Sequence, residues 1–258
     1  MKFISYESPS LHKFCPAEFD ITNGCNTLRI GTLWGFREAE NQLLRDAGEG
    51  EFEYRIRFPK LTRVSREWIS EFEVGIDGQA EIESIHFDAG THASTKDLTL
   101  RGSSQNCWIF CVSMSNAAVG NVSEAHESHW TIPGENVQEF GAFLAELLWS
   151  RVSLDDLPSE LVKKHSFQEL CSWIGIVGEM KPVRYVDREL HIEKEEDYPI
   201  EKIRAWKADV PFLKPIRFSE EREFRFAFWL TFKKEKISIR DNPKILNLRQ
   251  IDRFISTI

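Results

Sequence analysis

The sequence predicts an α+β fold, built on a mixed, mostly antiparallel β-sheet core with peripheral helices. Residues 51–58 and 223–232 alternate apolar and polar side chains with the period of two that marks a strand. The continuous apolar run at 107–112 is typical of a central strand. Apolar residues at three- and four-residue spacing over 135–150 indicate an amphipathic helix. Because strands and helices do not alternate regularly, the pattern favours α+β over α/β.

Composition narrows the classes of protein that this chain can belong to. Of its 258 residues, 41% are hydrophobic and 29% are charged, as in ordinary globular proteins. The formal net charge of −8 disfavours a general binder of polyanions. No apolar run approaches the ~18 residues needed to span a bilayer, and the first residues lack a signal-peptide pattern. We therefore expect a cytoplasmic protein without a membrane partner, and no linker divides it.

The first half of the chain is predicted to be rich in strands. A strand at 27–33 is followed by a helical turn at 34–41 and a turn at 46–50. The alternating strand at 51–58 should bury its aromatic and aliphatic face and end at Pro59. Further short strands are expected near 69–76, 80–87 and 96–101, with a hairpin signal at 75–78.

The second half is predicted to hold the helices and the strongest strand. A second helix is expected at 158–172, with Pro158 near its first turn. The remaining predictions are strands at 173–177 and 181–186, solvated surface at 188–197, a helix at 200–208, a strand at 223–232, a partner for it at 236–240 and a final helical turn.

Several familiar site motifs are absent from the sequence. There is no G-x-G-x-x-G, no P-loop and no G-x-S-x-G. The segment from His126 to His129 lacks the H-E-x-x-H spacing that places two histidines on one helical face, so we interpret it as a polar loop rather than a metal site. The five cysteines form no C-x-x-C pair, which favours reduced thiols over disulfides or structural zinc.

Four segments, taken in order, resemble a large family of bacterial proteins that share a domain of unknown function. That family shows a cysteine-aromatic-serine strand end and a late Lys-Pro … Glu-x-Glu-aromatic-Arg strand. Here Val112 stands in place of the usual aromatic residue. The segments are Leu28–Leu33 followed by Phe36-Arg37, Glu40-Asn41, Arg45-Asp46 and Glu49-Gly50; Phe110–Ser113 with Trp130; Phe212–Pro215; and Phe218–Phe226.

The same order also resembles the ADP-ribosyltransferase superfamily, which includes toxin and phage-defence members. In that superfamily an Arg or His ends the first core strand, a Ser, Thr or Tyr lies on a later strand, and a Glu lies on a strand near the end. The resemblance assigns these roles to Arg29, Ser113 and Glu223, with Glu221 completing an E-x-E. It implies one ADP-ribosyltransferase-like domain over residues 1–258, with NAD as substrate and no metal.

The resemblance also implies a separate role for each of these residues. Breaking the nicotinamide–ribose bond passes through an oxocarbenium-like transition state, which the Glu223 carboxylate would stabilise. Arg29, Thr32 and Arg37 would bind NAD, the arginines through its phosphates. Ser113 would orient the nicotinamide ribose or the carboxylate. Glu221 would activate the acceptor as a base, since residues two apart on a strand share a face.

Several alternatives stay open at this point. The acceptor would be RNA, DNA or protein, and a toxic enzyme of this kind would have a neutralising antitoxin partner. The same site fits an NAD glycohydrolase, and the scaffold also fits a non-catalytic binding or sensor module. In structural terms, the E-x-E with Arg222 and Arg225 also fits a solvent-facing ladder of ion pairs.

Overall fold

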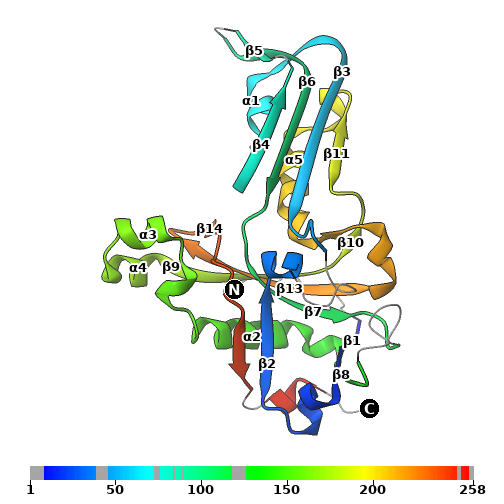
Figure 1. The fold of residues 1–258 in the computed structure, drawn as a ribbon, viewed down its shortest axis with the longest axis vertical. Coiled ribbons are helices and arrows are strands. Elements are labelled where there is room, and N and C mark those ends of the chain that lie inside the picture. Colours follow the sequence, from blue (N-terminus) through cyan, green and yellow to red (C-terminus); the bar gives the residue numbers. More distant parts are fainter. Residues whose placement is uncertain are drawn as a thin grey trace. The chain divides into compact units, whose positions relative to one another are not determined.

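The structure is a computed structural model of the chain, and it describes residues 9–38, 46–72, 76–83, 85–88, 90–117, 126–248 and 251–255 (Figure 1). Contacts divide the chain into two compact units. The first comprises Met1–Glu49, Asn106–Arg184 and Arg217–Ile258, and the second comprises Gly50–Gln105 and Tyr185–Ile216. A single ADP-ribosyltransferase-like domain stays a prediction, and each unit is described by itself.

The first unit is built on a sheet in which eight strands are described. They are β1 (Leu11–Cys15), β2 (Thr27–Thr32), β7 (Trp108–Ser113), β8 (Ser128–Ile132), β9 (Ile174–Pro182), β13 (Glu223–Phe232), β14 (Glu235–Ile237) and β15 (Lys244–Asn247). The main path runs β14-β13-β7-β1-β8, while β9 pairs with β13, β2 with β7, and β15 with β2. The pairings described within this sheet are antiparallel, so the predicted α+β class with a mostly antiparallel sheet is confirmed.

Strand β13 lies at the centre of this sheet and is buried along nearly its whole length. It pairs with β7 over residues 223–228 on one edge and with β9 over 224–232 on the other. One face of β13 carries Phe224, Phe226, Phe228 and Leu230 into the apolar core, as the alternation predicts. The opposite face carries Glu223 and Arg225, and this face is buried as well.

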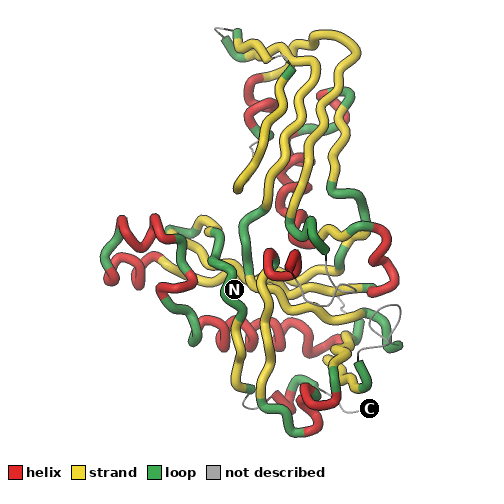
Figure 2. The backbone as a smooth tube through the Cα atoms, in the orientation of Figure 1, coloured by secondary structure: helices red, strands yellow, loops and turns green. Residues whose placement is uncertain are grey.

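Helix α2 (Val137–Trp149) covers the apolar face of the sheet, as Figure 2 shows. Its buried residues follow the spacing that predicted a helix at 135–150. Gly141 permits the close approach, because a Cβ there would clash with Sδ of Met180 on β9 and lie 3.3 Å from the ring of Phe226. Stacked and edge-on rings of Phe110, Trp130 and Phe140 fill the centre of this core.

The second unit is a five-stranded sheet with helices on one face. Its strands are β3 (Glu51–Ser65), β4 (Ile76–Ile82), β5 (Ile85–Phe87), β6 (His92–Ser103) and β11 (Glu189–Ile192), and its helices are α1 (Arg66–Ser70) and α5 (Ile200–Asp209). The predicted burial of Phe52, Tyr54, Ile56 and Phe58 is confirmed, and these side chains pack with Trp68 and Ile203 of the helices. The short strands β10 (Arg184–Tyr185) and β12 (Leu213–Lys214) form a separate pair.

Pro59 does not end its strand, which corrects one prediction. Strand β3 continues to Ser65, and its register against β6 shifts between Arg57 and Thr62. Proline has no N–H to donate to a ladder, but an irregularity in the pairing removes the need for that donor. The strand therefore passes the proline where its pairing is interrupted.

The strand predicted near 69–76 is wrong at its start, because residues 69 and 70 belong to α1, whereas residues 73–75 lie outside the described residues. Ser65 accepts a hydrogen bond from the Trp68 backbone N–H at 3.1 Å, and this N-cap begins α1. A hairpin was also predicted at 75–78. Residue 75 lies outside the described residues, and residues 76–78 belong to strand β4, which begins at Ile76. The cap outweighs the strand propensity of Trp68 and Ile69.

Three predictions in the second half need correction. The helix predicted at 158–172 is two helices, α3 (Ser159–Lys164) and α4 (Phe167–Trp173), because Ser166 forms a new capping box with Glu169. The strands predicted at 173–177 and 181–186 merge largely into β9. The charged segment 188–197 holds β11, which buries Leu190 and Ile192 and pairs in parallel with β3.

Candidate functional site

Strands β7 and β13 bring two of the predicted site residues together. Ser113 ends β7 and Glu223 begins β13, and the antiparallel register places them directly opposite each other. Directly opposed residues on neighbouring strands have Cβ atoms about 4.5–5.5 Å apart on the same face. That face is the one turned away from α2 and the apolar core. Ser113 and Glu223 are therefore neighbours on the polar face of the sheet.

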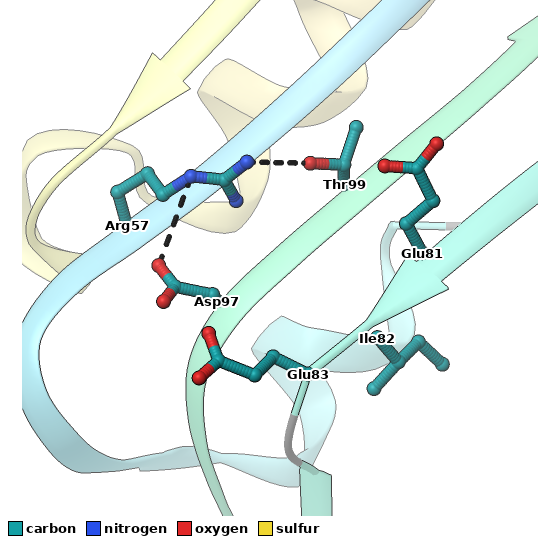
Figure 3. Close-up of a pocket in the computed structure, with 6 residues that line it drawn as sticks. All are labelled: Arg57, Glu81, Ile82, Glu83, Asp97 and Thr99. Atoms are coloured by element: carbon teal, nitrogen blue, oxygen red, sulfur yellow. Dashed lines mark hydrogen bonds and ion pairs between the residues drawn. The ribbon is translucent and has the colours of Figure 1, made fainter.

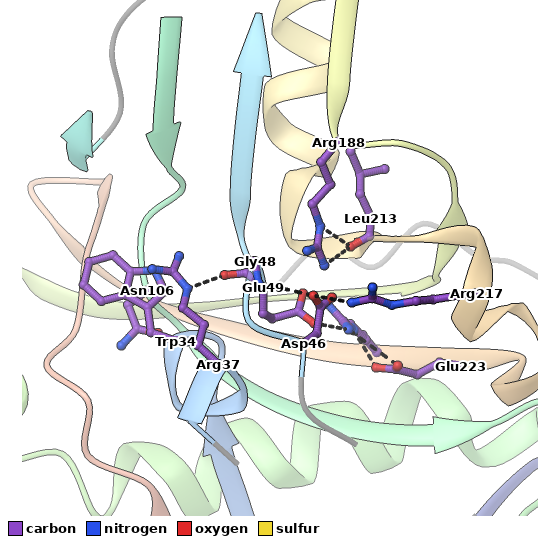
Figure 4. A network of polar contacts seen from close by, with 11 residues as sticks. Trp34, Arg37, Asp46, Gly48, Glu49, Asn106, Arg188, Leu213, Arg217 and Glu223 are labelled. Atoms are coloured by element: carbon purple, nitrogen blue, oxygen red, sulfur yellow. Dashed lines mark hydrogen bonds and ion pairs between the residues drawn. The ribbon is translucent and has the colours of Figure 1, made fainter. Parts of the chain in front are cut away.

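The Glu223 carboxylate belongs to a buried cluster with Arg225 and Glu49, which Figure 4 shows as part of a wider polar network. Nε of Arg225 donates to Oε1 of Glu223 at 2.5 Å. Nη1 and Nη2 of Arg225 donate to the two carboxylate oxygens of Glu49 at 2.8 and 3.1 Å. The exposed fractions are 5% for Glu223, 1% for Arg225 and 1% for Glu49, so water screens these charges little.

Because Glu223 and Arg225 are buried, they do not belong to a solvent-facing ladder of ion pairs, which the sequence also allowed. Burial by itself would lower the pKa of the Arg225 guanidinium, but the charges of Glu223 and Glu49 raise it well above its usual value. Arg225 thus stays charged inside the unit. A buried cluster of this kind holds its members in one geometry, because an unpaired buried charge is costly.

A tight turn positions Glu49 for this contact. The Glu49 N–H donates to the carbonyl of Asp46 at 2.9 Å, and the Gly48 N–H donates to the Asp46 side chain at 3.3 Å. The Arg37 side chain donates through Nε to the Glu49 carbonyl at 2.6 Å. Arg37 lies on the 3-10 helix Trp34–Glu38, with its guanidinium 5.2 Å from the centre of the Trp34 ring. Arg37 is therefore joined to the cluster through Glu49.

Glu221 reaches this region by a different route from the one expected. It ends the 3-10 helix Ile216–Glu221 and does not lie on β13, so the argument that residues 221 and 223 share a strand face does not apply. Arg222 between them has a φ of 45°, a left-handed conformation that non-glycine residues rarely adopt. The Glu221 carbonyl accepts a hydrogen bond from the Ser113 hydroxyl at 2.9 Å, so the backbone there is still tied to β7.

The polar row continues beyond Ser113 onto residues that sequence reasoning missed. His12 on β1 lies opposite Ser113, and Thr131 on β8 lies opposite His12. The Thr131 hydroxyl and Nδ1 of His12 are 3.0 Å apart. Burial, and then the nearby His129, lower the pKa of His12, which favours the neutral imidazole. Four neighbouring strands thus contribute Thr131, His12, Ser113 and Glu223 to one line across the sheet.

Arg29 and Thr32 lie apart from this cluster. Arg29 is exposed on β2, where it pairs with Ile245 of β15. Thr32 is buried, and its hydroxyl donates to the carboxylate of Asp241. Among the contacts described for Glu49, Arg225 and Glu223, none involves either residue. The structure therefore brings together Ser113, Glu223, the Glu221 backbone and Arg37, but not Arg29 or Thr32.

The thiol nearest to the cluster is not set up as a nucleophile. Cys111 lies opposite Arg225 on β7. Burial, and then the charge of Glu223, raise the pKa of the Cys111 thiol well above its usual value. A thiol that stays protonated at neutral pH is a poor nucleophile. All five cysteines are free.

The segment from His126 to His129 is not wholly a loop, because Ser128 and His129 belong to β8. Within the residues that the structure describes, no group of three or more His, Cys, Asp or Glu side chains is arranged to hold a metal ion. No helix in the described part of the chain is long and apolar enough to cross a membrane.

Two hollows are found on the surface of the second unit. One, of about 340 Å³, lies on the charged face of its sheet, where Arg57 pairs with Asp97 and bonds Thr99 (Figure 3). The other, of about 500 Å³, lies at the start of α1 beside His92. Both are open and lined mainly by polar side chains, and neither includes a predicted site residue.

Comparisons of the chain with protein-family models, with curated proteins and with solved structures each find no match. The candidate site is therefore described from its own geometry. Glu49 and Arg225 lie in segments that carry the resemblance, but the resemblance gives them no role. The available signals were the Glu49-Gly50 pair at the end of the predicted turn and the Arg two residues after Glu223 on a strand.

Proposed function

We propose that the chain is an NAD-dependent ADP-ribosyltransferase of toxin or phage-defence type, which transfers ADP-ribose to a macromolecule. The observation that carries this proposal is the pairing of Ser113 with Glu223 across two central strands. The expected chemistry needs a carboxylate held rigidly beside a hydroxyl, because charge developing on the ribose must meet a preorganised partner. The register provides that juxtaposition from residues far apart in the sequence.

In this proposal Glu223 stabilises the positive charge that develops at the anomeric carbon as the bond to nicotinamide breaks. Ser113 and Glu221 are half-buried, so they form the side of the cluster that NAD approaches. Ser113 orients the nicotinamide ribose, and Glu221 accepts a proton from the attacking group of the acceptor. Arg37 is the phosphate-binding arginine adjacent to the cluster. Arg29 would act only through a part of NAD that extends towards β2.

The acceptor and the partners belong to the proposal as well. A macromolecular acceptor, RNA, DNA or protein, would bring its nucleophile to the ribose carbon that loses nicotinamide. An antitoxin would neutralise the chain by covering the same polar face. We also propose that it acts in the cytoplasm, where NAD is present and thiols stay reduced.

A second candidate function, a non-catalytic binding or sensor module, is favoured by one observation. Glu223 is 5% exposed and already paired with Arg225. A carboxylate in this state fits a structural role, because a buried pair resists the removal of either partner. In that case the scaffold would bind a ligand without turnover.

The test is incubation of the purified chain with NAD labelled in its adenosine part, following nicotinamide release. Total RNA, fragmented DNA and protein extract are added separately. Release that depends on one of these, with label carried onto it, supports a transferase and names the acceptor class. Release at an equal rate without any acceptor indicates a glycohydrolase. No release, with no NAD binding by calorimetry, overturns the proposal in favour of the non-catalytic module.

A further inference from the structure

The guanidinium of Arg225 is shared between two carboxylates, each on its own edge. The edge formed by Nε and Nη2 faces Glu223, with donor–acceptor distances of 2.5 and 3.5 Å. The edge formed by Nη1 and Nη2 faces Glu49, at 2.8 and 3.1 Å. The planar fork of arginine permits this double use, and the ammonium of lysine does not. The separation of Glu49 from Glu223 is therefore set by the width of one guanidinium.

Glu49 changes the electrostatics of Glu223 without touching the ribose in the proposed reaction. Paired with Glu223 alone, Arg225 would form a neutral pair, whereas here its hydrogen bonds divide the guanidinium between Glu223 and Glu49. A neutral pair would do little to stabilise a developing positive charge. The second carboxylate offsets the guanidinium, so that Glu223 keeps its negative charge available for the ribose.

Glu49 is also fixed from its other side. Its backbone N–H bonds the Asp46 carbonyl, and its own carbonyl accepts from Arg37. Glu49 is 1% exposed, so its side chain cannot rotate out into solvent. The Glu49 carboxylate is therefore preorganised. Folding already holds it in place, so it does not have to reorganise during the reaction.

We infer that Glu49 is a positioning residue of the proposed ADP-ribosyltransferase site, acting on Glu223 through Arg225. This inference rests on the proposed function. It adds a residue for which the sequence reasoning gave no role, and it assigns Arg225 as the link. Glu49 orients the guanidinium and offsets its charge, while, of the three residues in the cluster, only Glu223 contacts the substrate.

The test is Glu49→Gln, which keeps the size of the side chain and removes its charge. We expect the maximal rate of nicotinamide release to fall about tenfold or more, because Arg225 then neutralises Glu223 and is less firmly held. NAD affinity should stay within about twofold of wild type, since Glu49 does not contact substrate. The readout that separates a positioning role from a purely structural one is this split, a lower maximal rate at an unchanged affinity for NAD.

Glu179→Gln is the matched control. Glu179 lies on β9 of the same sheet and pairs with Lys236 at 2.5 Å, so the variant also loses a partly buried ion pair. If both variants have the same maximal rate and the same NAD affinity, Glu49 has a purely structural role and the inference is overturned. If Glu49→Gln does not fold, Glu49→Asp is measured instead. It keeps the charge but draws it back from Arg225, so the maximal rate should fall while NAD affinity is retained.

The outcome separates this inference from the proposed function. A wild-type chain that neither binds NAD nor releases nicotinamide overturns both. An active wild type with Glu49→Gln indistinguishable from Glu179→Gln overturns the inference alone. An active wild type, with a Glu49→Gln variant that is slower but binds NAD with unchanged affinity, supports both.

Discussion

Arg225 and Glu49 meet through two hydrogen bonds, of 2.8 and 3.1 Å, although 176 residues separate them in the chain. Arg225 lies on the central strand β13, and Glu49 lies on the turn before β3. Their contact ties that turn to the middle of the sheet in the first unit. Because both side chains are at most 2% exposed, the loss of either would remove a buried partner of the other's charge.

Arg225→Met should destabilise the fold by about 3–5 kcal/mol, because it removes the guanidinium that two buried carboxylates share. The free energy of unfolding in a urea titration measures this loss. Arg101→Met is the control, since Arg101 pairs with Glu53 and Glu81 at the surface and its side chain is 45% exposed. That control should lose no more than about 1 kcal/mol. Equal losses in the two variants would show that the cluster is not a buried charge network.

Glu223→Gln should slow nicotinamide release by about a hundredfold or more while leaving NAD binding largely intact, because the shape is kept and the charge is lost. The rate is measured with the acceptor that gives the fastest release, and binding is measured by calorimetry. Circular dichroism checks that the variant is folded. Activity near the wild-type rate would mean that Glu223 is not the catalytic carboxylate.

Phe226→Ala should cost about 3–5 kcal/mol, because the ring is fully buried between β13 and α2 and leaves a cavity when truncated. Phe167→Ala is the matched control, since this ring is 66% exposed at the start of α4. It should change the free energy of unfolding by no more than about 0.5 kcal/mol. A negligible loss for Phe226→Ala would contradict the assignment of the apolar face.

The stability of the fold should fall with acidification in a way that depends on His12. Burial, and then His129, lower the pKa of His12 in the folded chain from 6.5, so the unfolded chain binds the proton more readily. The contribution of the neutral ring is present above pH 6.5 and is lost as pH falls from there through the lower folded pKa. In His12→Gln this loss disappears.

The measurement is the urea midpoint of wild type and His12→Gln between pH 8 and about pH 5, where a histidine titrates. The difference in free energy between the two should be greatest at the alkaline end and shrink below pH 6.5. A difference that stays constant across this range would contradict the linkage.

Local patterns predicted much of the secondary structure, and failed where another local signal was stronger. The alternation at 223–232 and the spacing at 135–150 match β13 and α2. The helix at Arg66–Ser70 was missed because an N-cap serine outweighed apolar residues that also suit a strand. β11 was missed because it is short. Its two buried residues alternate with polar ones inside a segment rich in charged residues, where so short an alternation is hard to recognise.

The candidate site was predicted only in part. The sequence analysis named both Ser113 and Glu223. Their pairing depends on the register between β7 and β13, which cannot be predicted from either strand by itself. Arg29 and Thr32 were named beside them, but β2 pairs with β15 over residues 27–30 and with β7 only at residues 31 and 32, opposite Ile109 and Trp108 rather than Ser113. The local signal at Glu49 indicated only a turn, and His12 had no signal, because the contacts of both residues come from other strands and turns.

By itself the sequence determined that residues 223–232 form a strand with one apolar face, since a period of two places Phe224 and Phe226 on the same side. It could not determine whether Glu223 and Arg225 on the other face meet water or protein. Only the tertiary structure decided that they are buried, because β7, β9 and the turn carrying Glu49 assemble around them from distant parts of the chain. Whether a side chain is buried depends on the segments that pack around it in the folded chain. A charged side chain is buried only where a group of opposite charge is buried beside it.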